Sequence, residues 1–176
     1  MGDSATPATT GEEAVVAFVE IPKGSRNKYE YDPALGRVAL DRHLFTSMSY
    51  PADYGFIVDT LGEDSDPLDA LILVSDPTFP GCAIRVRPVG VFHMTDEKGP
   101  DEKIICVPFK DPEWSAITDI QDISPNYRDE IEHFFSQYGR LEGKRVETEG
   151  FGDRNDAERF IAEARERFEQ KDGPTL

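Results

Sequence analysis

The sequence lacks the features of a membrane protein or a disulfide scaffold. No apolar run approaches the ~20 residues that a transmembrane helix needs. Residues 1–13 carry neither a basic start nor an apolar segment, so they do not resemble a secretory signal and are expected to form a flexible tail. The two cysteines, Cys82 and Cys106, match no metal-binding spacing. We therefore expect a cytoplasmic protein in which both are buried, reduced thiols.

Basic residues are also scarce. The chain has 19 Lys plus Arg against 35 Asp plus Glu, which gives a net charge of −16. This charge argues against nucleic acid or an anionic membrane as a partner. A nucleotide-binding role is disfavoured too, because no glycine-rich loop ends in Lys-Ser or Lys-Thr. The acidity itself has three open explanations: solubility, a saline habitat, or carboxylates gathered to hold hard cations.

What is present is enough for one folded domain. At 176 residues, with 38% hydrophobic and 10% aromatic residues, the chain can bury a core without disulfides or zinc, and we assign residues 14–176 to a single domain. Short apolar or alternating segments predict strands at residues 14–21, 27–31, 37–42, 70–74, 84–92 and 103–109. In the strand at residues 37–42, Val38 and Leu40 are expected to face inward. Glycine and proline between them favour a small barrel or a rolled sheet.

Two helices are expected beside this β core. Ser124 and Pro125 are typical of an N-cap and a first helical residue, and aromatic and aliphatic residues then recur at helical spacing up to residue 138. Gly139 is expected to stop this helix. The second helix covers about residues 155–170, with one apolar face.

The middle of the chain gathers acidic residues. Between Arg42 and Arg85 there is no lysine or arginine, and three aspartates fall within residues 64–69, DSDPLD, directly before an apolar run. Like charges crowded beside a buried strand are unfavourable unless a cation neutralises them, and hard cations such as Mg²⁺ take oxygen ligands. By itself, the pattern fits a metal site and a solvated acidic turn equally well.

Two weaker signals lie on either side of this motif. A second acidic segment lies at residues 95–103, between two expected strands, and by itself it is typical of an exposed hairpin loop. Lys28 and Glu30 share one face of their expected strand, which would suit a phosphate oxygen and a metal ion side by side. The same spacing also fits an ordinary solvated strand face.

The DSDPLD motif is similar to the Asp-x-Asp-Pro-x-Asp signature of the family I soluble inorganic pyrophosphatases. The ordered set of matches is far more specific than the signature alone, and it favours the metal site over the solvated turn. The other matching segments are EIP at 20–22, NKYE at 27–30, LDR at 40–42, YPADYGFI at 50–57, FPG at 79–81, RPVG at 87–90, MTDE at 94–97 and HFF at 133–135.

The resemblance implies hydrolysis of pyrophosphate to two orthophosphates by metal-activated water, with several Mg²⁺ ions in one site and Mn²⁺ as an alternative ion. It also implies an α+β fold that is mainly β: a five-stranded OB-like barrel with two flanking helices, one of them C-terminal. Bacterial members commonly form hexamers, so a homo-oligomer, expected to be a hexamer, is implied.

Roles for individual residues follow from the same resemblance. Asp66 resembles the general base that helps to deprotonate the attacking water. The principal metal pair would be held by Asp64, Asp69 and Asp101. Metals that arrive with the substrate would be held by Glu30 and Asp96. The phosphate-binding groups would be Lys28, Arg42, Tyr54, Lys103 and Tyr138. Matching positions with less defined roles are Glu20 and Tyr50.

One position departs from the family pattern. Family members typically place a phosphate-binding lysine directly after the tyrosine that corresponds to Tyr138, whereas this chain has Gly139 and then Arg140. We hypothesise that Arg140 supplies the missing cation.

Three other interpretations stay open on the sequence. A non-catalytic OB-like module could bind a cation or a small anion, but it would not need Asp66 together with the distant Lys28 and Arg42. A purely structural oligomer leaves the acidic clusters unexplained. The third is a degenerate, inactive pyrophosphatase, because Gly139 stands where the family places a phosphate-binding lysine.

Overall fold

The computed structural model describes residues 15–171, so the expected tail at residues 1–13 lies outside the described part. The described strands are β1 (Val15–Ile21), β2 (Asn27–Asp32), β3 (Arg37–His43), β4 (Asp53–Ile57), β5 (Asp69–Ile72), β6 (Ala83–Asp96), β7 (Gly99–Pro100), β8 (Lys103–Pro108) and β9 (Glu147–Gly152). The described α-helices are α1 (Pro125–Gln137) and α2 (Arg154–Lys171). Short 3-10 turns lie at η1 (Pro112–Trp114), η2 (Ile120–Asp122) and η3 (Arg140–Glu142).

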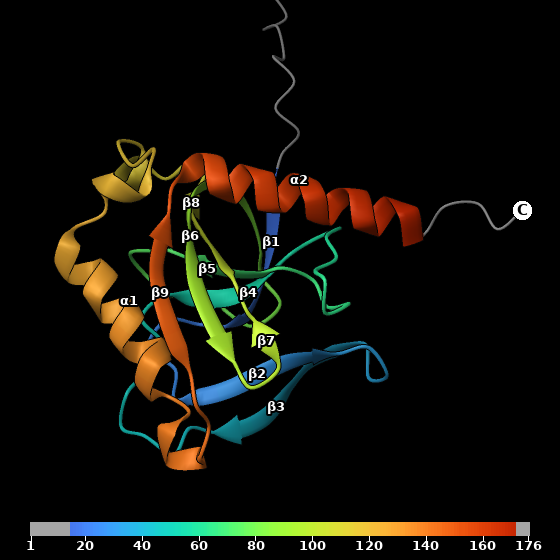
Figure 1. Cartoon of the computed structure of the whole chain (residues 1–176), viewed down its shortest axis with the longest axis vertical. Coiled ribbons are helices and arrows are strands. Elements are labelled where there is room, and N and C mark those ends of the chain that lie inside the picture. The colour runs from blue at the N-terminus through green and yellow to red at the C-terminus, as the bar shows by residue number, and fades with distance from the viewer. Residues whose placement is uncertain (1–14, 172–176) are drawn as a thin grey trace, which may run out of the picture.

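Five strands close into an uneven ring in the order β1–β4–β5–β8–β6, because β6 pairs back onto β1. The pairs are antiparallel except for β5 with β8, which is parallel. The ring is uneven because β6 has 14 residues and β5 only 4. Closure leaves these strands no free edge within the ring. The expected five-stranded, OB-like barrel with two helices is confirmed (Figure 1).

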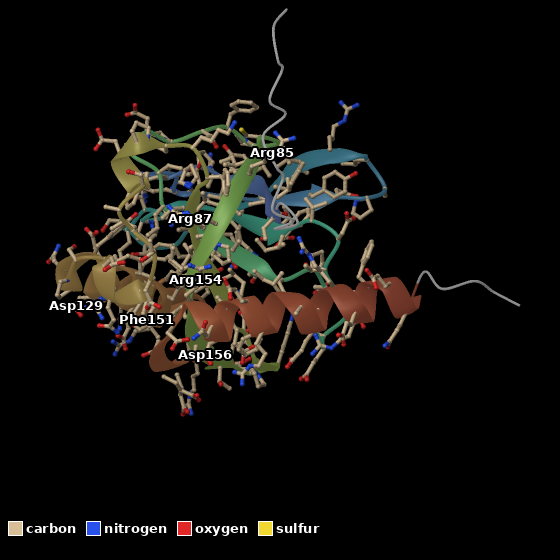
Figure 2. The ribbon with its side chains drawn as sticks, turned by 90° about the horizontal axis from the view of Figure 1, so that it is seen from above. Arg85, Arg87, Asp129, Phe151, Arg154 and Asp156 are labelled. Atoms are coloured by element: carbon tan, nitrogen blue, oxygen red, sulfur yellow. The ribbon has the colours of Figure 1, made fainter. Side chains whose placement is uncertain are left out.

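The two helices cover different sides of the barrel. Helix α1 packs beside β9, and α2 lies along one side of the molecule against β6, as Figures 1 and 2 show. The start of α1 follows the expected chemistry: the Ser124 side chain accepts a hydrogen bond from the Tyr127 amide, and Pro125 opens the first turn. None of the helices within residues 15–171 is long and apolar enough to span a bilayer.

The core consists of two buried clusters that fix the strands around the later site. One cluster joins the barrel to α1 through Phe134, Phe135 and Phe92. The other joins it to α2 through Ala157 and Ile161. Where β4 crosses β1, an added Cβ on Gly55 would lie 1.8 Å from the Phe18 carbonyl oxygen, so only glycine lets these strands pair. Close packing of this kind holds the ends of β4, β5 and β8 in register.

The β2–β3 hairpin corrects one prediction. These strands form a separate two-stranded sheet that projects from the barrel (Figure 1). Leu40 was expected to face inward, but it is 59% exposed, and Val38 is only partly buried. The prediction was wrong because a hairpin outside the ring has no second layer to cover both apolar side chains.

Two further expectations need correction. Cys106 is buried as expected, but Cys82 is partly exposed, since it lies in the turn before β6; both are free thiols. Helix α1 ends at residue 137, close to the expected stop, yet Gly139 is right-handed at φ −95°. The left-handed glycine is Gly143, at φ 76°, which closes the 3-10 turn that follows.

Candidate functional site

The centre of the candidate site is the buried ammonium group of Lys103 at the start of β8. Its side chain is 2% exposed, and Nζ lies 2.9 Å from Asp69 Oδ2 and 3.2 Å from each Asp101 carboxylate oxygen. Nζ also lies 2.7 Å from Tyr54 Oη, which donates to Asp69 Oδ2 at 2.6 Å. Burial lowers the pKa of Lys103, but the carboxylates of Asp69 and Asp101 outweigh it and raise the pKa above its ordinary value. Lys103 therefore carries its positive charge in this buried position.

Pairing of neighbouring strands brings these groups together. Asp69 opens β5 and Lys103 opens β8, and the two residues are partners in the parallel register. Tyr54 lies on β4, on the other side of β5, and Asp101 comes two residues before Lys103. Three adjacent strands and the residues that lead into β8 thus present one lysine, one tyrosine and two carboxylates at the same end of the ring.

The acidic groups around this lysine repel one another. Burial raises the pKa of Asp101 to about 6; Lys103 opposes the rise, while Asp69 and Asp96 add to it. Burial likewise raises the pKa of Glu20 to about 7, with a hydrogen bond from the Tyr31 amide opposing it and Asp69 and Glu30 adding to it. The negative charge at this end of the barrel exceeds what Lys103 neutralises.

Tyr138, at the end of α1, belongs to the same group. Burial raises its pKa, and the charges of Lys103, Asp101, Lys28 and Asp69 all act on it. Its ring stacks on Phe134 with a centroid distance of 5.4 Å, so α1 fixes the position of the ring. A protonated tyrosine donates a hydrogen bond, which suits an anionic ligand.

The β2–β3 hairpin adds two cations to the periphery. Lys28 lies 2.6 Å from Glu30 Oε1, so these two side chains do share a face as expected, and it lies 3.6 Å from Asp41 Oδ2. Arg42 donates to both carboxylate oxygens of Glu142 and to Asp41. The hydrogen bond to Glu142 raises the pKa of Arg42. Both cations are therefore oriented by carboxylates before any ligand binds.

The DSDPLD motif forms a tight, exposed turn before β5. The Gly62 amide donates to the Asp66 carbonyl at 2.7 Å, and the Asp66 amide donates to Asp64 Oδ1 at 3.0 Å. Ser65 adopts a left-handed φ of 72°. Within residues 15–171, no side chain pairs with the Asp66 carboxylate. The turn leaves that carboxylate exposed and without a side-chain partner among the described residues.

The structure brings together most of the predicted site residues, but not all of them. Asp64 and Asp66 lie on the segment that leads into Asp69, but among the described residues their side chains contact none of the residues around Lys103. Arg140 is exposed, and its Nη1 lies 3.3 Å from Gln137 Oε1. The predicted site residues that are linked by contacts, directly or through a shared Asp41, or by mutual electrostatic effects are Lys28, Glu30, Arg42, Tyr54, Asp69, Asp96, Asp101, Lys103 and Tyr138.

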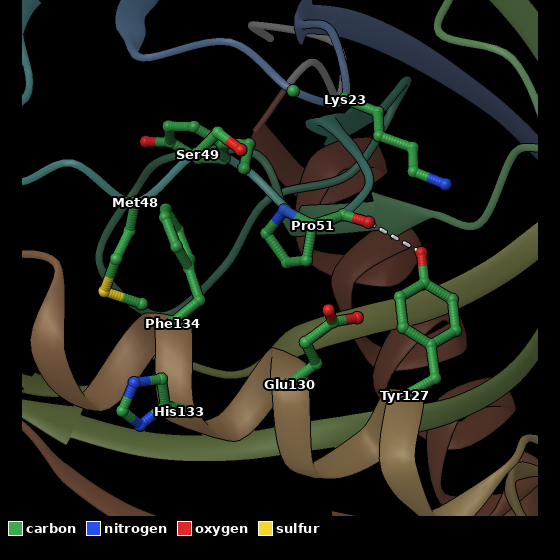
Figure 3. A pocket seen from close by; sticks show the side chains of 10 residues that line it. Lys23, Met48, Ser49, Pro51, Tyr127, Glu130, His133 and Phe134 are labelled. Atoms are coloured by element: carbon green, nitrogen blue, oxygen red, sulfur yellow. Dashed lines mark hydrogen bonds between the residues drawn. The ribbon is translucent and has the colours of Figure 1, made fainter.

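A separate cavity of about 440 Å³ opens between α1 and the segment around Pro51 (Figure 3). Its lining includes Lys23, Glu130 and His133. Tyr127 Oη donates to the Pro51 carbonyl at 2.7 Å, and Lys23 Nζ donates to the Val74 carbonyl at 3.3 Å. Because no acidic cluster occurs among its described lining residues, this cavity is not the candidate site.

Comparison with known proteins decides the family. The family model described as inorganic pyrophosphatase matches residues 17–169. The chain belongs to the inorganic pyrophosphatase family. The inorganic pyrophosphatase of Streptomyces coelicolor is 54% identical over 156 residues, which is 88% of this chain and 96% of that protein. That of Leifsonia xyli is 59% identical over 144 residues, 81% of this chain and 88% of that protein.

Solved structures of inorganic pyrophosphatases share the fold. The crystal structure of the Thermus thermophilus enzyme matches with a TM-score of 0.87 at 44% identity, covering 96% of this chain and 95% of that one. The Helicobacter pylori enzyme matches with a TM-score of 0.87 at 38% identity, covering 94% and 99%. The barrel and both helices are therefore those of an inorganic pyrophosphatase.

The donor chemistry of this pyrophosphatase site fits a hard divalent cation. The candidate ligands all offer carboxylate oxygen, which Mg²⁺ prefers. Within residues 15–171, no three Asp, Glu, His or Cys side chains converge as a ready-made metal cage. Mg²⁺ is usually held by one or two carboxylates, several waters and substrate phosphates rather than by such a cage, so spaced carboxylates suit it better than zinc.

Two residues have roles that the sequence did not reveal. Glu142, 7% exposed, orients Arg42 from 100 positions further along the chain, and no local pattern indicates this pairing. Asp53 falls in the acidic stretch but is fully buried, where it accepts hydrogen bonds from the Lys23 amide at 2.8 Å and the Thr78 amide at 3.1 Å. Asp53 therefore holds two loops together and is not part of the pyrophosphatase site.

Proposed function

We propose that this chain hydrolyses pyrophosphate to two orthophosphates, with water activated at a site that holds several Mg²⁺ ions. The observation that carries this proposal is the arrangement around Lys103, where one cation, one tyrosine hydroxyl and two carboxylates meet at the end of three strands. Pyrophosphate needs cationic donors for its oxygens, and the surplus carboxylates need cations. A polyanion bound together with divalent cations satisfies both requirements.

The chain's carboxylates divide into two groups in this proposal. Asp64, Asp69 and Asp101 would hold the principal pair of ions. Glu30 and Asp96 would hold ions that enter with the substrate. When bound, such cations supply positive charge to phosphate oxygens and acidify water. Inorganic pyrophosphatases are generally metal-dependent, which agrees with a requirement for such cations.

Asp66 would take the proton of the attacking water. Its carboxylate is exposed, unpaired within the described residues and held on a turn fixed by its own backbone bonds. The water oxygen forms a bond to one phosphorus while the bond from that phosphorus to the bridging oxygen breaks. One pyrophosphate and one water thus yield two orthophosphates.

The cationic and phenolic groups would bind and neutralise the phosphates. Lys103 and Tyr54 lie at the centre, and Lys28 and Arg42 reach in from the hairpin. Each of the latter is paired with a carboxylate, so its orientation is set before the substrate arrives. Charge on the leaving phosphate is then stabilised by groups that need little rearrangement.

Isotope labelling tests the reaction directly. In water enriched in ¹⁸O with Mg²⁺ present, ³¹P spectroscopy should show pyrophosphate converted to two orthophosphates, with one solvent oxygen incorporated per pyrophosphate consumed. A folded protein that binds pyrophosphate and Mg²⁺ but releases no phosphate would instead indicate the non-catalytic binding module or a degenerate family member.

Arg140 is proposed to replace the lysine that the family pattern places at Gly139. Arg140 lies in η3 and is exposed, and among the described residues its side chain hydrogen-bonds only the partly buried side chain of Gln137. We expect Arg140→Ala to raise the Michaelis constant for pyrophosphate about tenfold, as the loss of one charged hydrogen bond does. Steady-state kinetics at saturating Mg²⁺ measures this. An unchanged Michaelis constant and turnover would refute the replacement.

Oligomerisation and location are also proposed. We infer a homo-oligomer, expected to be a hexamer, from the family resemblance, and the exposed apolar side chains of Leu40, Phe45 and Leu141 support a subunit contact. Sedimentation at several concentrations tests this.

A cytoplasmic location is proposed from the free thiols of Cys82 and Cys106.

A further inference from the structure

The C-terminal half of α2 is attached to the residue from which the acidic turn begins. The Leu61 amide donates to the Ala164 carbonyl at 2.9 Å. The Leu61 carbonyl accepts a hydrogen bond from Arg167 Nη1 at 3.2 Å. Both the amide and the carbonyl of Leu61 are therefore hydrogen-bonded to α2. Leu61 and Arg167 are 106 positions apart in the chain.

The hydrogen bond to Leu61 matters more than the ion pairs of Arg167. Its Nη2 lies 3.8 Å from Glu63 Oε1 and 3.6 Å from Glu163 Oε2. The Glu63 side chain is 86% exposed, so this pair contributes little to stability. The contact with the Leu61 carbonyl is directed and partly buried, and it fixes a position as well as a charge.

The segment that follows Leu61 behaves as one unit. The Gly62 amide is bonded to the Asp66 carbonyl at 2.7 Å, and the Ser65 amide to the Gly62 carbonyl at 3.2 Å. An added Cβ on Gly62 would lie 2.8 Å from Asp64 Oδ1, so the turn is closely packed. Displacing Leu61 would consequently displace Asp64 and Asp66 with it.

The turn also stores strain that its attachments must balance. Ser65 is left-handed at φ 72°, and Asp59 on the near side of Leu61 is left-handed at φ 57°. Residues other than glycine rarely adopt this conformation, and it persists where surrounding contacts determine it. On the far side, the Leu68 amide is held by Thr60 Oγ1 at 3.1 Å. The Leu68 carbonyl also accepts a hydrogen bond from the Ile57 amide at 2.8 Å, and the contacts from α2 to Leu61 add a further attachment.

We propose that Arg167 is a positioning residue for the pyrophosphatase site: by holding the Leu61 carbonyl, it fixes the turn that presents Asp64 and Asp66. This role rests on the proposed function of those two carboxylates. Arg167 touches neither of them, so it acts through the backbone of the turn. The C-terminal helix is thereby part of the support of the site as well as a cover for β6.

The experiment compares Arg167→Met with Arg159→Met. Arg159 lies on the same helix, is well exposed, and pairs with Asp156 at 3.1 Å. It has no contact with the turn among the described residues, so the control removes the same charge from α2 without touching Leu61. Arg167→Lys keeps a donor and serves as the conservative variant.

Amide hydrogen exchange without added metal is the first readout. We expect exchange at residues 59–68 to be about fivefold faster in Arg167→Met than in the wild type, from the loss of one hydrogen bond, with unchanged exchange in β8. Arg159→Met should exchange as the wild type does. Faster exchange throughout the barrel, or none at the turn, would overturn the proposal.

The Mg²⁺ dependence of turnover is the second readout. We expect the half-saturating Mg²⁺ concentration to rise about tenfold in Arg167→Met, with the Michaelis constant for pyrophosphate unchanged at saturating Mg²⁺ and partial recovery in Arg167→Lys. An unchanged Mg²⁺ dependence despite a loosened turn would overturn the positioning role. An inactive wild-type protein would defeat the proposed function itself, which the exchange data would distinguish from a failure of the contact.

Discussion

Replacing Asp66 with asparagine should lower turnover of pyrophosphate about a thousandfold, the magnitude typical of a lost general base. The carboxylate has no partner among the described residues, so the substitution breaks no contact, and the backbone bonds that shape the turn do not involve it. Steady-state turnover at saturating Mg²⁺ measures the loss, and thermal unfolding should be unchanged. The defect should lie in turnover rather than in folding.

Two comparison variants make this result specific. Asp76→Asn removes the same charge from an exposed position in the same acidic stretch and should leave turnover as it is. Asp69→Asn should instead raise the half-saturating Mg²⁺ concentration at least tenfold, since Asp69 is a proposed ligand. Metal affinity that falls equally in Asp66→Asn and Asp69→Asn would contradict a separate base role for Asp66.

Replacing Lys103 with methionine should damage both catalysis and stability. The substitution removes a buried cation, so Asp101 loses its cationic partner and Asp69 keeps only the hydrogen bond from Tyr54 Oη. Asp69 and Asp101 are 34% and 28% exposed, so water screens part of the lost pairing. The free energy of unfolding should therefore fall by about 2 kcal/mol, less than for a fully buried pair. Loss of a charged donor to the phosphates should lower kcat/KM about a hundredfold. Thermal unfolding and steady-state kinetics measure the two effects.

Divalent cations should partly restore the stability of Lys103→Met. If Asp69 and Asp101 hold such ions, Mg²⁺ replaces the missing ammonium group, so the Tm of the variant should rise more on adding Mg²⁺ than the Tm of the wild type. Lys110→Met, which removes an exposed lysine shortly after β8, should respond as the wild type does. An equal Mg²⁺ effect in all three proteins would contradict the assignment of these two carboxylates.

Local chemistry made much of the fold predictable. Strands and helices followed from alternation, from helical spacing and from the cap at Ser124, because these signals act within a few residues. Leu40 was misplaced because alternation shows which residues share a face, but does not show whether another layer covers that face. The layer depends on where the hairpin leaves the barrel, which is a tertiary property.

The candidate site was predictable as a set of residue types, but its geometry was not. The DSDPLD motif and its matching segments indicated the residues, yet nothing in them shows that Lys103 lies buried between Asp69 and Asp101. That placement results from the parallel register of β5 and β8. Long-range supports such as Glu142 on Arg42 and Arg167 on Leu61 join distant segments and leave no local signal.

Metal-dependent hydrolysis is tested most directly by phosphate release from pyrophosphate by the purified protein with Mg²⁺, then with excess EDTA, then with Mg²⁺ restored. We expect rapid release that EDTA abolishes and added Mg²⁺ recovers. A folded protein that releases no phosphate with Mg²⁺ or Mn²⁺, or one whose release is indifferent to EDTA, would contradict it.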